Sequence, residues 1–197
     1  MFNTYVVTFL VIQAGFPLWL AILGGVGTAI LMGFTIDYLV IRHTKKVSPV
    51  AKQIITLGLI MVILGLAPMF FGVDPLNLPR LIPEGSVNIL GANLSYNGLF
   101  NIVFGFSLMF ILFYILQNTK VGLAVRTTAS NEYTARLMGV PTKTVTLGAW
   151  ALAAVLGLLA GVMIAPTTSV NLNLMDVVQV NALIACVFGG FQTFYGP

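Results

Sequence analysis

Long apolar runs separated by short polar segments dominate this chain. Four of them, which cover residues 18–36, 54–71, 102–116 and 145–165, approach or reach the roughly 20 residues that a helix needs to cross about 30 Å of hydrocarbon. None alternates polar and apolar positions as a membrane barrel strand does. The pattern predicts an all-α, polytopic helical integral membrane protein. Its spans are expected at about 17–40, 53–72, 98–116 and 145–165, with partial or re-entrant pieces at 1–14 and 180–194.

Composition supports that interpretation. The chain of 197 residues is 58% hydrophobic and only 7% charged, whereas soluble domains carry about a quarter charged residues. An ordinary soluble core is therefore excluded. The single cysteine, Cys186, permits no internal disulfide and is interpreted as a small buried hydrophobe.

The distribution of Lys and Arg along the chain predicts its topology in the membrane. Eight of the nine Lys and Arg residues lie within residues 41–52 or 117–144, which are alternate loops. By the positive-inside rule these loops are predicted to be cytoplasmic, and the loops at 73–97 and 166–179 face outward. The net charge of +4 thus reports topology and is no sign of a nucleic-acid partner.

Small residues predict where helices pack. The run at 145–165 carries a stripe at every fourth position, and the glycines of the first long run allow close approach in the same way. The predicted packing residues include Ala153, Gly157 and Gly161 of that stripe, Gly24, Gly25, Gly27 and Thr28 of the first run, and Gly189 and Gly190 near the end. In the outer loop, prolines oppose a long helix, and residues 87–96 are expected to form a short hairpin.

Several chemistries are missing from the sequence. No ionisable residue lies inside an apolar run, which disfavours a proton relay on a midplane carboxylate. Metal-helix, nucleophile-turn and phosphate-loop motifs are absent, so no catalytic residue, metal or cofactor is expected. Active transport would need energy from another polypeptide. The scattered polar residues inside the runs are expected to satisfy neighbouring helices rather than to form a substrate site: Gln13, Thr28, Thr56, Asn101 and Ser107.

One soluble-looking stretch interrupts the apolar pattern, "GLAVRTTASNEYTARLMGVP" at residues 122–141. Ser130 is the expected N-cap of a helix of about eight residues that ends at Gly139 in a left-handed conformation. Glu132 suits the first turn. So short a helix is marginal alone and needs a partner. Tyr133, Leu137 and Met138 would supply its apolar side, while Arg136 and Lys143 would reach acidic groups. The alternative is a loop whose cations only set topology.

This stretch and the following span ending "GLLAGVMIAP" resemble the branched-chain amino acid permease family of ABC importers, specifically its H-type subunit. The resemblance covers the whole chain and implies a single permease domain over residues 1–197, with further family helices before Met1 and after Pro197. The importer pattern E-A-A-x-x-x-G survives here only as Ala135 and Gly139. The matching residues are Gly122, Arg126, Ala129, Asn131, Ala135, Leu137, Met138, Gly139 and Val140, then Gly189, Gly190, Thr193 and Gly196.

The resemblance implies a permease subunit in a bacterial or archaeal inner membrane that imports branched-chain or other hydrophobic amino acids. Implied partners are cytoplasmic ATP-binding subunits, a second permease subunit, an external solute-binding protein and membrane lipid. The implied ATPase-docking loop comprises Arg126, Ser130, Asn131, Glu132, Tyr133, Ala135, Arg136, Leu137, Met138 and Gly139. Related permeases carry urea or sugars. Two other classes stay open, a non-transporting scaffold that binds anionic lipid through its basic loops and an ion-coupled secondary carrier.

Overall fold

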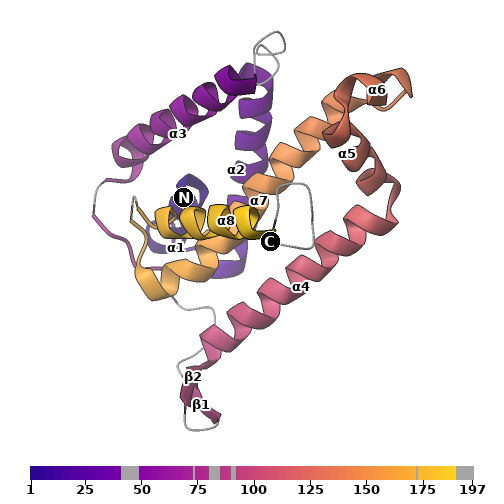
Figure 1. Ribbon diagram of the computed structural model, residues 1–197. Coiled ribbons are helices and arrows are strands. Elements are labelled where there is room, and N and C mark those ends of the chain that lie inside the picture. The colour runs from indigo at the N-terminus through magenta and orange to yellow at the C-terminus, as the bar shows by residue number, and fades with distance from the viewer. Residues whose placement is uncertain (41–48, 73, 80–84, 90–91, 172, 190–197) are drawn as a thin grey trace. The chain divides into compact units, whose positions relative to one another are not determined.

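Helices make up most of the structure, a computed structural model that describes residues 1–40, 49–72, 74–79, 85–89, 92–171 and 173–189. The predicted all-α fold is confirmed, with one small hairpin in addition (Figure 1). The helices are α1 (Phe2–Ile12), α2 (Leu18–Leu39), α3 (Pro49–Phe71), α4 (Tyr96–Asn118), α5 (Lys120–Ser130), α6 (Glu132–Leu137), α7 (Thr142–Thr168) and α8 (Asp176–Gly189).

Four segments among the described residues are long and apolar enough to cross a membrane. They are Leu18–Leu39, Ile54–Phe71, Tyr96–Asn118 and Thr142–Thr168. These coincide with the four long runs of the sequence. The shorter apolar helices α1 and α8 occupy the two terminal pieces, and the predicted piece at 180–194 continues past Gly189 outside the described residues.

The chain divides into two compact units, residues 1–78 with 150–197 and residues 79–149. In the first unit, helix α2 buries a stripe of residues at every fourth position: Ala21, Gly25, Ala29, Gly33 and Asp37. A Cβ on Gly25 would lie 2.3 Å from Val7 of α1, and a Cβ on Gly33 would lie 3.0 Å from the backbone of Ala151. The small residues therefore let α2 pack closely against α1 and α7.

Helix α1 is anchored in this unit by aromatic rings. The ring of Phe71, at the end of α3, is 5.6 Å from the ring of Tyr5 and close to Phe2 and Phe9. Nearby, Leu76 and Val170 pair as an antiparallel bridge with N···O distances of 3.0 and 2.7 Å. The segments that follow α3 and α7 are thus joined.

The second unit begins with the hairpin. Strands β1 (Ser86–Ile89) and β2 (Ala92–Ser95) pair antiparallel, with Ser86 opposite Ser95, so the predicted hairpin is confirmed. The Ser95 hydroxyl accepts a hydrogen bond from the Gly98 amide at 3.1 Å and caps α4. The hairpin therefore leads directly into the first turn of an apolar helix.

A tight turn joins α4 to α5. The Thr119 hydroxyl accepts a hydrogen bond from the Gly122 amide at 3.1 Å and caps α5. A Cβ on Gly122 would lie 2.2 Å from the Leu116 carbonyl oxygen. Only glycine permits that approach of the two helices.

Candidate functional site

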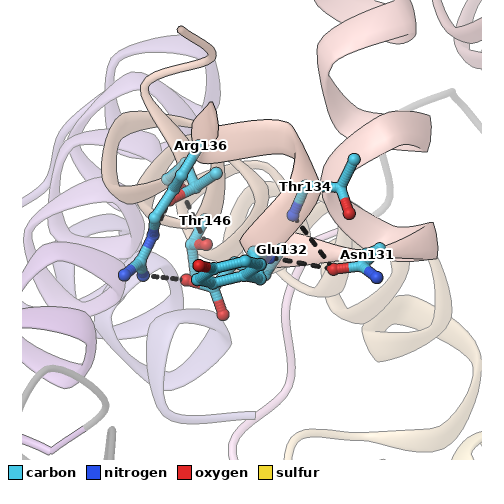
Figure 2. A network of polar contacts seen from close by, with 7 residues as sticks. Asn131, Glu132, Thr134, Arg136 and Thr146 are labelled. Atoms are coloured by element: carbon cyan, nitrogen blue, oxygen red, sulfur yellow. Dashed lines mark hydrogen bonds and ion pairs between the residues drawn. The ribbon is translucent and has the colours of Figure 1, made fainter. Parts of the chain in front are cut away.

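The soluble-looking stretch holds two helices where the sequence predicted one. Asn131, with φ −156° and ψ 104°, is extended backbone and separates α5 from α6. Its Oδ1 accepts hydrogen bonds from the amides of Tyr133 and Thr134 at 3.0 and 3.1 Å (Figure 2). Ser130 is the last residue of α5, so its predicted role as N-cap is wrong. The cap belongs to the residue at which the helical backbone breaks, because only there does the side chain reach the free amides.

The other end of α6 follows the prediction. Gly139 has φ +81°, the left-handed conformation expected of it. Its amide donates to the Arg136 carbonyl and the Val140 amide donates to the Ala135 carbonyl, both at 3.0 Å. This pair of bonds is a Schellman motif, which satisfies carbonyls that the helix leaves free. A six-residue helix is thus closed at both ends.

Arg136 ties α6 to the start of α7. Its Nη2 forms an ion pair with Glu132 one turn earlier, and its Nε donates to the Thr142 hydroxyl at 2.9 Å. The Thr146 hydroxyl donates to the Thr142 carbonyl, also at 2.9 Å. Figure 2 shows the Arg136 side chain directed toward Glu132. The guanidinium that was predicted to meet a partner's acidic group is therefore engaged within the chain.

Helix α6 turns its larger apolar side chains outward. Tyr133, Leu137 and Met138 are 73%, 72% and 74% exposed, whereas Ala135 is buried. Arg126 of α5 is directed toward α4 instead, since its Nη2 donates a hydrogen bond to the Gln117 carbonyl at 3.4 Å. Within the predicted docking loop, Arg126 therefore bonds to α4 and Ala135 is buried, while Tyr133, Leu137 and Met138 form an exposed apolar surface, named here the α6 apolar face.

The two ends of the predicted packing stripe of α7 differ in burial. Gly161 and Ala165 are buried, and a Cβ on Gly161 would lie 2.1 Å from Thr4 Oγ1. Ala153 and Gly157 are exposed, and a Cβ on Gly157 meets nothing within 4 Å. Packing at those two positions stays a prediction. Gly189 ends α8, and Gly190 lies outside the described residues.

A cavity of about 370 Å³ lies within the first unit, between side chains of α1, α2, α3, α7 and α8. Its wall is mostly apolar, and the polar side chains among its described lining residues include Asn3, Asp176 and Gln179. Asn3 is 9% exposed and its Oδ1 has no hydrogen-bond partner. The sequence interpretation missed this site because it treated residues 1–14 as a plain apolar piece. The available signal was Asn3, a polar residue in an otherwise apolar stretch, which is buried and lines the cavity.

Among the residues that the structure describes, no group of three or more His, Cys, Asp or Glu side chains is placed to hold a metal ion. The long apolar helices and the apolar cavity define a multi-pass helical membrane protein. Over residues 1–197 the chain matches the family described as branched-chain amino acid transport system / permease component, and it belongs to that family. It is therefore a component of a membrane transport system. Neither a curated protein nor a solved structure matches it significantly.

Proposed function

We propose that this protein is the permease subunit of an ATP-driven ABC importer in a bacterial or archaeal inner membrane. Its cargo is a branched-chain or other hydrophobic amino acid. The observation that carries the proposal is the exposed α6 apolar face on a capped, tied-down helix, in a chain without a phosphate-binding loop. Family membership supports the transport role.

The α6 apolar face has the properties of a docking element. Three large apolar side chains stand free on a segment whose backbone is held by the Asn131 cap, the Gly139 turn and the Arg136 bonds. Pre-organisation of this kind lowers the entropy lost on binding. An apolar helix face that enters a groove is a common recognition mode, and a few central side chains carry most of its binding energy.

The partner on this surface is a cytoplasmic ATP-binding subunit, because the segment lies in a loop that the charge pattern predicts to be cytoplasmic. A second permease subunit and an external solute-binding protein complete the importer. Since Arg136 joins α6 to Thr142, a displacement of α6 by the ATPase is passed to α7, which is continuous from Thr142 to Thr168. Movement of that helix then alters access to the transport path.

The test is a pair of leucine truncations in the full-length permease co-expressed with its ATP-binding subunits. Leu137→Ala removes part of the α6 apolar face, and Leu123→Ala removes an exposed leucine from α5. Burying a leucine contributes about 1.5–3 kcal/mol, so Leu137→Ala should weaken ATPase association about tenfold or more. Leu123→Ala should leave it unchanged. Affinity co-purification and substrate-stimulated ATP hydrolysis measure both, and equal effects of the two variants would contradict docking through α6.

The lipid-binding scaffold predicts a different result. Its cations should face lipid, yet Arg126 and Arg136 bond within the chain, and only the exposed Lys120 and Lys143 of this segment remain for it. A scaffold should also bind anionic vesicles without any ATPase. The same co-purification therefore separates the two functions, because a permease must recover its ATP-binding subunits.

A further inference from the structure

The cavity of the first unit has the size and lining of a small-molecule site. Its volume of about 370 Å³ falls in the range typical of ligand pockets, which are mostly apolar with a few polar groups. Ile60, Ile63 and Leu158 belong to its apolar wall. All of its described lining residues come from the first unit.

Its polar groups favour one charge over the other. Asn3 Oδ1 is buried without a hydrogen-bond partner, an arrangement that costs free energy unless a donor reaches it. The carboxylate of Asp176 and the amide of Gln179 lie three positions apart on α8 and line the same cavity. No Lys, Arg or His side chain is among its described lining residues, although Met1, which carries the α-amino group, also lines it.

We propose that this cavity binds a small apolar solute through the solute's primary ammonium group. An ammonium carries three donors and no acceptor, so it suits Asn3 Oδ1, the Asp176 carboxylate and the Gln179 carbonyl together. The apolar wall buries the hydrocarbon body. Among the described lining residues, no cationic side chain is placed to meet a carboxylate of the solute. This inference rests on the proposed import function and names the part of the cargo that the permease recognises.

Trp150 provides a reporter that needs no ATPase, because it lines the cavity while Trp19 of α2 is exposed elsewhere. Full-length permease is labelled with 5-fluorotryptophan in lipid nanodiscs, and the two ¹⁹F resonances are assigned with Trp19→Phe and Trp150→Phe. Three probes share one hydrocarbon skeleton: leucine, leucinamide and 4-methylpentanoate. Leucine and leucinamide should shift the Trp150 resonance and leave Trp19 in place. At equal concentrations, 4-methylpentanoate should shift neither.

Matched variants then locate the ammonium. Asp176→Asn should weaken leucinamide binding about two- to fivefold, because Asp176 is exposed and water screens its attraction for an ammonium group. Asp74→Asn changes an exposed carboxylate outside the cavity and should leave binding unchanged. Asn3→Leu removes the buried acceptor and should weaken binding, whereas Asn3→Asp keeps an acceptor of the same size and should retain it. The spectrum without ligand shows whether each variant is folded.

The outcomes are decisive in both directions. A Trp150 resonance that no probe shifts, or one that 4-methylpentanoate shifts as much as leucinamide does, overturns the proposal. Equal weakening by Asp176→Asn and Asp74→Asn overturns it as well. ATPase docking is measured separately through Leu137→Ala, so a silent cavity leaves the importer function standing. Loss of docking with an intact ¹⁹F response counts against the importer alone.

Discussion

Replacement of Gly161 by alanine tests a close approach between α1 and α7. A Cβ at this position would lie 2.1 Å from Thr4 Oγ1 and 2.8 Å from Met175 Cε. Thr4 is fully buried on α1, so its hydroxyl has little room to withdraw. At Gly157, one turn away on the same helix, a Cβ meets nothing within 4 Å. The two glycines are therefore a matched pair that differs in packing.

The expected magnitudes follow from two opposing terms. Overpacking a close contact costs about 1–3 kcal/mol, and replacing glycine by alanine inside a helix gains up to about 1 kcal/mol. Gly161→Ala should therefore lose about 1 kcal/mol of unfolding free energy on balance, whereas Gly157→Ala should gain up to about 1 kcal/mol. A gap of about 2 kcal/mol corresponds to about 4–8 °C in melting temperature for a protein of this length.

Thermal midpoints of the full-length permease, measured by size-exclusion chromatography after heating in one detergent, compare the two variants. The double variant Thr4→Ala/Gly161→Ala removes the hydroxyl that the new methyl group meets. Thr4 Oγ1 has no hydrogen-bond partner, so Thr4→Ala alone should cost little unfolding free energy. The double variant should therefore regain most of the stability that Gly161→Ala loses. Equal midpoints for Gly161→Ala and Gly157→Ala would refute the close contact, and so would a double variant no more stable than Gly161→Ala.

Two further predictions concern the ends of α6, and hydrogen exchange of its backbone amides measures both. Asn131→Ala removes a side chain that accepts two amide hydrogen bonds and should destabilise the helix by about 0.5–2 kcal/mol. The control variant Ser130→Ala should have no such effect. Faster exchange in Ser130→Ala and not in Asn131→Ala would show that Ser130 is the cap. Gly139→Ala places a Cβ at φ +81° and should cost about 1–2 kcal/mol, which unchanged exchange would contradict.

The four long apolar helices could be predicted from the sequence because their cause is local. A helix across hydrocarbon needs enough consecutive apolar residues, and the four long runs satisfy that requirement without reference to the rest of the chain. The hairpin likewise follows from prolines and a turn within a few residues. The C-terminal end of α6 was predictable for the same reason, since Gly139 acts through its own backbone.

Helix α5 was missed because its stability depends on a neighbour. Its sequence, "KVGLAVRTTAS", is short and only partly apolar, so it was interpreted as loop. The structure holds it by the Thr119 cap and by the approach of Gly122 to α4. The last residue of α5 then determines whether Ser130 or Asn131 caps α6. Both residues are good caps, and propensity alone does not choose between neighbours.

The faces of the helices required a different signal from the spans. Hydropathy does not say which side of a membrane helix is buried, because lipid and neighbouring helices are equally apolar. Along α2 the informative signal is the recurrence of a buried residue at every fourth position from Ala21 to Asp37. This series includes Gly25 but not Gly24 or Gly27. On α1 and α8 it is the polar side chains Asn3 and Gln179, which become one site only when the two helices line the same cavity. The spacing of small residues and the positions of isolated polar residues therefore indicate which sides of a helix are packed or face a ligand, whereas the mean hydropathy of the helix does not.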